Sequence, residues 1–175
     1  VKYRYPIIGD IMYYINSFFL YSLLGFIIES TIFKNTKLKP SGVLNGPITL
    51  VYGVGGIVLL LTNKYIIDKI HLSKIPKIII SFIIYTIIFS IVEFTCGHLC
   101  HLIFNVDMWD YTDKKYNIGK YVCLEYIGVW GIYGLLTTYI IKPFIDKIIK
   151  LIPKELTYIL IFITSLDFII TIITK

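Results

Sequence analysis

Residues 78–104 read IIISFIIYTIIFSIVEFTCGHLCHLIF, which is the longest apolar stretch of the chain. As a helix, a run of this length is sufficient to cross the roughly 30 Å hydrocarbon core of a bilayer. A helix is expected because an isolated strand in lipid leaves its backbone donors and acceptors without partners. This stretch therefore predicts a membrane-spanning helix.

Four more apolar stretches accompany this one, and none alternates with the period of two that a barrel strand needs. We therefore predict an all-α, polytopic membrane protein: a single transmembrane domain, residues 1–175, built as a bundle of about five helices. The predicted spans are residues 11–33, 48–62, 78–104, 121–141 and 156–173. Between the last two, Lys142 to Lys154 mixes apolar residues with lysines, which fits either a short interfacial helix or a plain connector.

Composition supports this class of protein. The chain is 57% hydrophobic and 16% charged, with a mean hydropathy of +0.78. In soluble domains about a quarter of the residues are charged. A soluble fold of 175 residues could not bury this much apolar surface. The net charge is +6, but the lysines flank apolar stretches, so nucleic acid is not an expected partner. Three cysteines make no disulfide framework.

The basic residues also predict an orientation, because loops on the cytoplasmic side carry an excess of lysine and arginine. With the N-terminus inside, ten basic residues lie inside and seven outside. The inside set is Lys2, Arg4, Lys64, Lys69, Lys74, Lys77, Lys142, Lys147, Lys150 and Lys154. The outside set is Lys34, Lys37, Lys39, Lys114, Lys115, Lys120 and Lys175. We expect an N-terminus inside, a bacterial cytoplasmic membrane, and a first helix that is retained rather than cleaved.

The second stretch is short and rich in glycine. It opens just after Pro47 and contains Gly53, Gly55 and Gly56. Small residues let membrane helices approach closely, so we expect this helix to pack tightly against a neighbour.

Ionisable residues inside apolar helices are costly and usually face a partner or a cavity. Glu29 lies near the end of the first predicted span, Glu93 in the last part of the third, and Glu125 one turn into the fourth. If each span crosses the membrane, the first and third spans end on the side where the fourth span begins. The three carboxylates are therefore expected in one leaflet, where they would line a polar pocket. Asp167 lies inside the fifth span. A structural hydrogen bond to a neighbouring helix is the alternative for Glu93.

Two loops are expected on the same side as that pocket. One contains Asn45-Gly46-Pro47, a tight-turn signal that indicates a shaped loop. The other contains Trp109, Asp110, Tyr111 and Asn117, a mixture of aromatic and polar residues that could line a site. Alternatively, Trp109 and Tyr111 are interfacial anchors and Asp110 caps a helix.

A metal site is a weaker hypothesis. Cys96, Cys100 and His101 share a broad helix face with Glu93, and thiolate, imidazole and carboxylate groups bind zinc. No CxxC pair or second ligand cluster accompanies them, so we expect no metal and no cofactor. The sequence also lacks a nucleophile elbow, a P-loop and a dinucleotide fingerprint, so no catalytic residue is assigned and ATP hydrolysis would need a separate subunit.

Several short segments, in order and spacing, resemble the family described as putative ABC-transporter type IV, also called CmpB-like and related to the TMEM229 proteins. They are Tyr21-Ser22-Leu23-Leu24-Gly25, Gly42-Val43-Leu44-Asn45-Gly46-Pro47, Val51-Tyr52-Gly53, Val92-Glu93-Phe94, Trp109-Asp110-Tyr111, Asn117-Ile118-Gly119 and Trp130-Gly131. The resemblance implies a small multipass membrane protein of the ABC-permease type. It marks Asn45, Glu93, Trp109, Asp110, Tyr111 and Asn117 as motif positions, whereas the cysteine and histidine group is not part of the pattern.

Three functions remain open at this point. The favoured one is a transport-associated component whose pocket is lined by Glu29, Glu93 and Glu125, working as a homo-oligomer or with a nucleotide-binding subunit. An intramembrane enzyme acting on a lipid or lipid-linked substrate is the second, since paired carboxylates and a histidine can perform acid–base chemistry. A non-catalytic membrane adaptor is the third.

Overall fold

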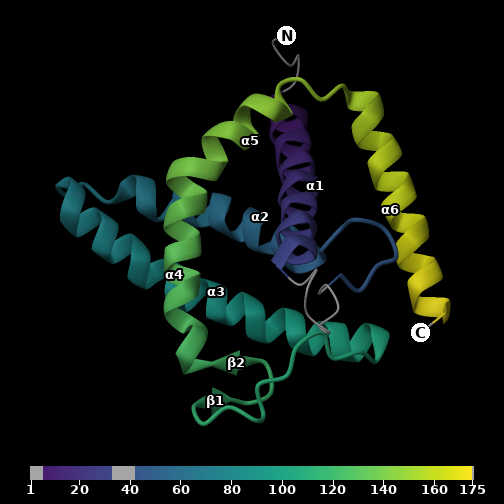
Figure 1. Ribbon diagram of the computed structural model, residues 1–175. Coiled ribbons are helices and arrows are strands. Elements are labelled where there is room, and N and C mark those ends of the chain that lie inside the picture. Colours follow the sequence, from purple (N-terminus) through teal and green to yellow (C-terminus); the bar gives the residue numbers. More distant parts are fainter. Residues whose placement is uncertain (1–5, 33–41, 175) are drawn as a thin grey trace. The chain divides into compact units, whose positions relative to one another are not determined.

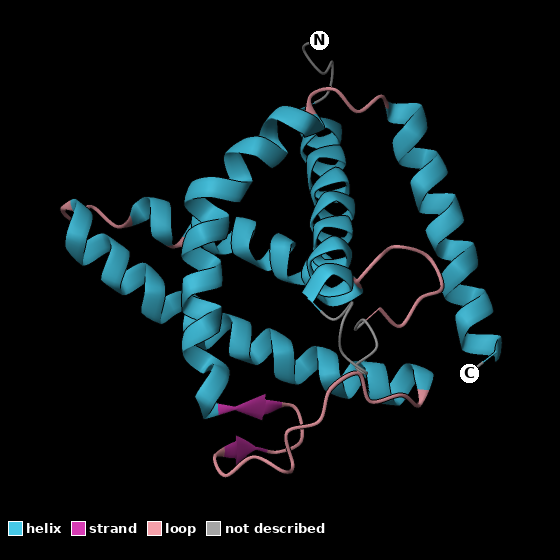
Figure 2. Cartoon of the chain, viewed as in Figure 1, coloured by secondary structure: helices cyan, strands magenta, loops and turns pink. Residues whose placement is uncertain are grey.

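The computed structural model describes residues 6–32 and 42–174, with side chains from Asp10 onward. Within these residues, five helices are long and apolar enough to cross a membrane. The remaining regular structure is one two-stranded ladder and three short helical segments (Figures 1 and 2). The predicted all-α membrane fold is confirmed. Residues 33–41, which include part of the first predicted loop, lie outside the described residues.

The main helices of the five spans are α1 (Pro6–Ile32), α2 (Leu50–Tyr65), α3 (Lys74–Phe104), α4 (Leu124–Leu136) and α6 (Lys154–Thr174). A 3-10 turn (Ile67–Lys69) lengthens the span of α2, and a π-helical turn (Thr137–Ile141) with α5 (Lys142–Ile149) lengthens the span of α4. The strands are β1 (Asn117–Ile118) and β2 (Val122–Cys123).

The helix ends differ from the predicted ones for local reasons. Helix α3 begins four residues earlier than expected, at Lys74, because Pro76 falls in its first turn, where a missing backbone N–H costs no hydrogen bond. Helix α4 begins later, at Leu124, because Val122 and Cys123 pair with β1. Helix α2 continues past Thr62 to Tyr65, although the apolar run ends at Thr62.

The segment after the fourth span is helical at its start. α5 follows the π-helical turn directly, so one helical stretch runs from Leu124 to Ile149. Within α5, Ile145 and Ile149 are buried whereas Phe144 and Ile148 are exposed, as expected for a helix with one covered face. The interfacial position of this helix stays a prediction.

The chain divides into two compact units, Val1–Ile57 with Phe144–Lys175, and Val58–Pro143. We call them unit 1 and unit 2 and describe each by itself. The single-domain expectation stays a prediction.

In unit 1, α1 and the start of α2 are in close contact through small residues. A Cβ atom at Gly53 would overlap Ser22 and Phe18, and one at Gly56 would overlap the ring of Tyr21. The expected close approach of the glycine-rich helix is therefore confirmed.

Helix α6 attaches to unit 1 differently. Of its residues that the structure describes, Thr157 and Thr171 are the buried ones. The Thr157 hydroxyl donates a hydrogen bond of 2.8 Å to Asn16 of α1, which is also buried. The large apolar side chains of α6, such as Phe162 and Ile169, are exposed on the isolated chain. These side chains suit contact with lipid.

In unit 2, α3 packs against α4. The buried side of α3 repeats at spacings of three or four residues: Ser81, Tyr85, Phe89, Glu93, Cys96 and Gly97. This periodicity defines one helix face. Tyr85 and Phe89 form a core with Leu59 and Ile67, and Trp130 of α4 packs against it. Glu93 is the charged residue of that face.

A polar network links three segments of unit 2 at the π-helical turn. The Tyr85 hydroxyl donates to the side-chain oxygen of Asn63, and Asn63 Nδ2 donates to the Thr138 hydroxyl at 3.1 Å. The Tyr85 and Thr138 hydroxyls are also 2.9 Å apart. Such wide turns replace i→i+4 bonds by i→i+5 bonds, and here Lys142 N–H reaches Thr137 O.

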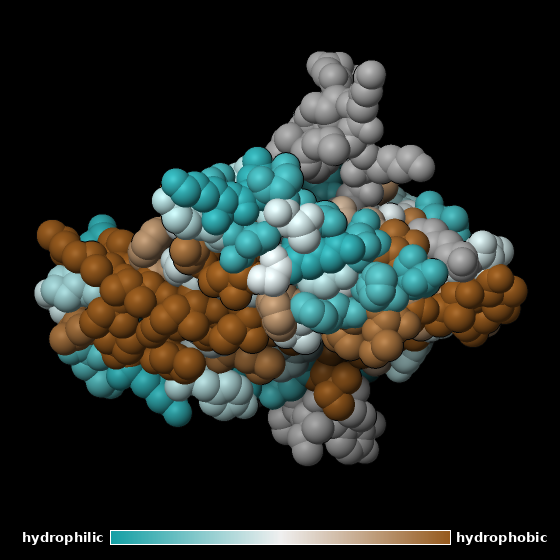
Figure 3. All heavy atoms as spheres, turned by 90° about the horizontal axis from the view of Figure 1, so that it is seen from below, coloured by the Kyte–Doolittle hydropathy of each residue, from teal (hydrophilic) through white to brown (hydrophobic). Residues whose placement is uncertain are grey.

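Apolar side chains cover much of the face drawn in Figure 3. On α3 the exposed ones include Ile79, Ile83, Ile87 and Ile91, again four residues apart and opposite the buried face. In water this would be an unfavourable surface, whereas in lipid it is the expected one.

Candidate functional site

Glu93 is buried, with 5% of its surface exposed, on the face of α3 that packs against α4. Its Oε2 accepts a hydrogen bond of 2.9 Å from the indole nitrogen of Trp130 in α4. Its Oε1 accepts one of 3.1 Å from the hydroxyl of Tyr111, in the segment between α3 and α4. A carboxylate inside a spanning helix thus has two donors, one on each oxygen.

The segment that carries Tyr111 is folded back by two left-handed residues. Asn105 ends α3 with φ of 52°, and Gly119 has φ of 65° in the turn between β1 and β2. Left-handed backbone is accessible to glycine without steric cost and tolerated by asparagine. The two strands pair antiparallel, with Asn117 opposite Cys123.

Three hydrogen bonds fix the position of Tyr111 and its neighbour. Tyr111 N–H donates to Lys120 O at 2.8 Å, and Asn117 Nδ2 donates to Tyr111 O at 3.1 Å. The indole nitrogen of Trp109 donates to Tyr121 O at 3.1 Å. The motif residues Tyr111 and Asn117 are therefore bonded to each other, and Trp109 is bonded to the same segment through Tyr121. Burial is the main factor that raises the pKa of the Tyr111 hydroxyl, and Glu93 adds to it, so this group is a donor at neutral pH.

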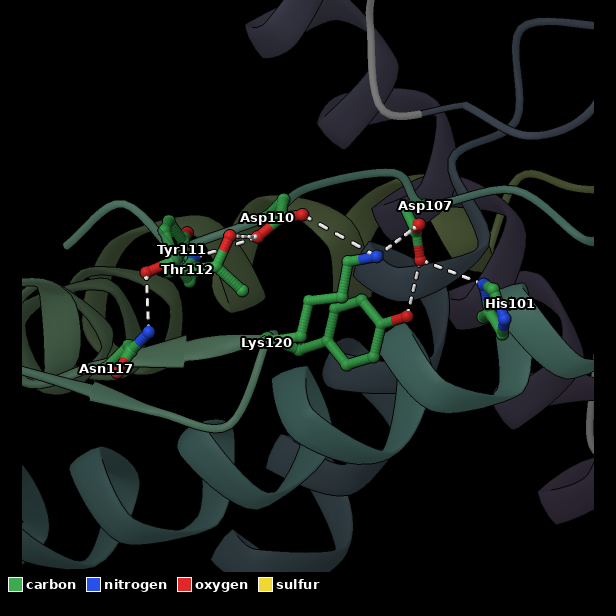
Figure 4. Close-up of polar contacts among 8 residues, drawn as sticks. His101, Asp107, Asp110, Tyr111, Thr112, Asn117 and Lys120 are labelled. Carbon is green, nitrogen blue, oxygen red and sulfur yellow. Dashed lines mark hydrogen bonds and ion pairs between the residues drawn. The ribbon is translucent and has the colours of Figure 1, made fainter.

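An ionic cluster near the end of α3 links the two ends of the same segment (Figure 4). Asp107 accepts hydrogen bonds from Lys120 Nζ and from the Tyr121 hydroxyl, each at 2.5 Å, and lies 3.0 Å from His101 Nδ1. The hydrogen bond from Lys120 is the main cause that lowers the pKa of Asp107 to about 2. The same contact raises the pKa of Lys120.

Asp110 has a local role in this segment. Its Oδ1 accepts hydrogen bonds from the backbone N–H of Thr112 at 2.8 Å and from the Thr112 hydroxyl at 2.7 Å. These bonds lower the pKa of Asp110, and its other oxygen lies 3.6 Å from Lys120 Nζ. The alternative that Asp110 caps a helix is wrong, because Thr112 belongs to a turn.

The hydrogen bonds described above for Glu93 involve neither Glu125 nor Glu29. Glu125 is exposed in the first turn of α4. It precedes Trp130 by five residues, which corresponds to about 140° around a helix, so the two side chains leave α4 in different directions. Glu29 is buried in α1, within unit 1. A pocket lined by Glu29, Glu93 and Glu125 together stays a prediction.

Asn45 has a partner that the sequence did not reveal. Its side-chain nitrogen donates to Asp167 Oδ1 of α6 at 2.9 Å and to the Thr171 hydroxyl at 3.1 Å. The backbone N–H groups of Asn45 and Gly46 donate to the two oxygens of Asp167, at 3.2 and 2.8 Å. The expected turn at Asn45-Gly46 therefore presents its donors to a carboxylate within unit 1.

The proposed metal ligands do not gather. Cys96 is buried, Cys100 is half-buried, and His101 is exposed and directed to Asp107. Within residues 6–32 and 42–174, the structure has no group of three or more histidine, cysteine, aspartate or glutamate side chains arranged to hold a metal ion.

Sequence reasoning missed Trp130, Asp107, Lys120 and the Asp167 contact as members of these sites. Asp167 carried a usable signal, an ionisable residue in an otherwise apolar helix, whereas Trp130 had none beyond its place in a motif.

Comparison with protein-family models gave a match to a family of membrane proteins. The model of the family described as "Putative ABC-transporter type IV" matches residues 16–175. These residues include Glu93 and Asp167 and the hydrogen-bond partners described above for each of them. No curated protein and no solved structure matches the chain. Since the match covers most of the chain and agrees with the motifs and the five apolar helices, the chain belongs to this family of membrane proteins.

Proposed function

We propose that the chain is a transport-associated, ABC-permease-like component of a membrane transporter, with its solute site at Glu93. The observation that carries the proposal is the buried carboxylate of α3, which is bonded to Trp130 of α4 and to Tyr111 of the segment between them. Buried ionisable groups in spanning helices commonly mark ion or solute pathways.

The surrounding contacts support this role. Hydrogen bonds within the segment that carries Tyr111, together with the Asp107–Lys120 pair, hold its residues to one another. We therefore expect the segment to move over Glu93 as one piece. Movement of such a segment would expose or cover the carboxylate, which is how lids control access to a site.

Further parts of the proposal concern the assembly. The chain spans a bacterial cytoplasmic membrane with its N-terminus inside, as the lysine and arginine distribution favours. It works as a homo-oligomer or with a separate nucleotide-binding subunit, because its own sequence has no P-loop.

Transport in membrane vesicles tests the proposal. Vesicles from cells that contain the protein are expected to accumulate a solute that vesicles from deletion cells do not, with and without ATP as separate arms. Glu93→Gln is expected to abolish the difference, whereas Glu155→Gln, at an exposed carboxylate in the first turn of α6, is expected to retain it. Equal solute profiles in the two kinds of vesicle would refute a transport role.

One observation favours a second candidate, an intramembrane enzyme that acts on a lipid or lipid-linked substrate. Asp107 orients Nδ1 of His101, which directs the other ring nitrogen away from the pair, as in many acid–base sites. Loss of a lipid product in His101→Gln, with unchanged solute uptake and unchanged thermal unfolding, would favour the enzyme over the transporter.

A further inference from the structure

The charge of Glu93 lacks a cationic partner in the described part of the chain. A carboxylate offers about four acceptor positions, and Glu93 uses two of them, for the neutral donors Tyr111 and Trp130. The ion pairs that the structure shows in unit 2 all involve Asp107 or Asp110 instead. A carboxylate buried among neutral groups is costly unless a cation or a proton accompanies it.

Both hydrogen-bond donors to Glu93 are aromatic side chains, and each of them packs against another ring. The Tyr111 ring lies against the Tyr126 ring, with centroids 5.4 Å apart, and the Trp130 ring lies 6.3 Å from that of Tyr133. Tyr126 is exposed, while Tyr111, Trp130 and Tyr133 are half-buried, so the group reaches the surface of unit 2. Cations are attracted to the faces of tryptophan and tyrosine rings, more strongly where water is excluded.

These surroundings discriminate among cations. Calcium and magnesium require six or more oxygen ligands in a regular shell, whereas the two bonded partners of Glu93 supply one phenol oxygen and one indole N–H group. An organic ammonium ion requires less. Its methyl or methylene groups pack on rings, and its charge is balanced by one carboxylate.

We propose that Glu93, Trp130, Tyr111 and Tyr126 form a binding site for a small organic ammonium group, either a free amine or the head of a lipid. This rests on the proposed function and names the class of solute. In the structure described here, Tyr111 and Trp130 bind the carboxylate through neutral donors. An ammonium ion would use the acceptor positions that these donors leave open and would contact the rings.

Fluorescence gives a direct test that needs no transport. The chain has two tryptophans, so Trp109→Phe leaves Trp130 as the single emitter. This variant, purified in a detergent without choline groups, is titrated with choline and with its neutral analogue 3,3-dimethylbutan-1-ol. We expect a saturable change in Trp130 emission with choline and none with the alcohol.

Variants in the same background locate the site. Glu93→Gln is expected to weaken choline binding at least about tenfold, because loss of one member of a buried charge pair is worth more than the 1.4 kcal/mol of a tenfold change. Tyr126→Leu is expected to weaken choline binding severalfold. Because Tyr126 is exposed, we expect this variant to fold normally, and thermal unfolding checks that it does. Glu155→Gln, at an exposed carboxylate of α6, is the matched control and is expected to bind normally.

Defined outcomes overturn the proposal. Equal responses to choline and the alcohol would show a simple apolar site, and normal choline binding by Glu93→Gln would remove the carboxylate from it. Emission that follows pH alone, without any effect of choline, would show that a proton is the ligand. Transport without choline binding would refute the ammonium site but not the transport role. Choline binding without transport would refute the transport role but not the ammonium site.

Two membrane compositions identify the source of the ammonium group. The apparent Kd of soluble choline is measured in nanodiscs of phosphatidylcholine and in nanodiscs of phosphatidylglycerol. A higher Kd in phosphatidylcholine would show competition by the lipid head group. Equal values in the two compositions would indicate a free amine.

Discussion

Each unit of the molecule contains a carboxylate within a spanning helix, and the two are bound in opposite ways. Asp167 in unit 1 accepts hydrogen bonds from two backbone N–H groups, from the Asn45 amide and from Thr171. Glu93 in unit 2 accepts one from a tyrosine and one from a tryptophan.

The difference is the one we expect between a carboxylate that stabilises the fold and a carboxylate that takes part in the proposed function. Four donors occupy the acceptor positions of Asp167, and two of them are backbone groups that cannot turn away. Glu93 keeps open positions, and its donors are side chains, one of them on a segment outside the helices. We therefore expect changes at Asp167 to act on stability and changes around Glu93 to act on function as well.

The largest effect is expected for Asp167→Ala. This change leaves the N–H groups of Asn45 and Gly46 and the Asn45 amide without their acceptor, at a cost of about 2–3 kcal/mol. Thermal unfolding in detergent measures it, with Glu155→Gln at an exposed site of the same helix as control. An unchanged melting temperature would mean that Asp167 is not a structural clasp.

Trp130→Phe should come next. It removes the donor to Glu93 Oε2 and leaves space where the larger indole was, and the two losses together are expected to cost about 2 kcal/mol. In contrast to Asp167→Ala, solute uptake should fall further than the loss of folded protein explains. Uptake that falls only in proportion to folded protein would make Glu93 a second structural carboxylate.

Tyr111→Phe is expected to have a smaller effect on stability. It deletes one hydroxyl and keeps the ring, so the free energy of unfolding should fall by about 1 kcal/mol. The segment between α3 and α4 would lose its bond to α3, and limited proteolysis between residues 105 and 120 should become faster. A digestion rate equal to that of the unmodified chain would show that the ionic cluster alone fixes this segment.

The smallest effect is expected for acid titration of the Asp107 cluster. The pKa of Asp107 is lowered from 3.8 to about 2, so its stabilising contribution is complete above about pH 4 and is lost as the pH falls toward 2. The raised pKa of Lys120 makes its contribution complete below about pH 10.5, with loss at higher pH. Asp107→Asn should remove the acid-dependent part of segment unfolding, which hydrogen exchange can follow.

The sequence was sufficient to predict the helices but not which groups they bring together. Apolar runs determine that residues such as 78–91 lie in lipid, because no other environment accommodates them. The same logic marked Glu93 and Asp167 as residues that need partners. It could not select Trp130 or Asn45, since the choice depends on the rotation of each helix and on the path of each loop.

Local geometry explains the other differences. The strands β1 and β2 contain two residues each, too few for a pattern with a period of two to be visible. The π-helical turn has an ordinary sequence, Thr137 to Ile141, and its wide geometry accompanies the Asn63–Tyr85–Thr138 network. Neither feature has a sequence signal of its own.

The contact between Asn45 and Asp167 joins residues 122 positions apart, so it can form only after the ribosome has made α6. When α6 enters the bilayer, its aspartate therefore arrives alone, with an insertion cost of about 2.5–3.5 kcal/mol if it reaches the centre. The isoleucines, leucines and phenylalanines of α6 each contribute roughly 0.3–0.6 kcal/mol in the other direction. Insertion of α6 is thus expected to depend on its own apolar residues, and binding of Asp167 to the turn at Asn45 is expected afterwards, as a separate step of biogenesis.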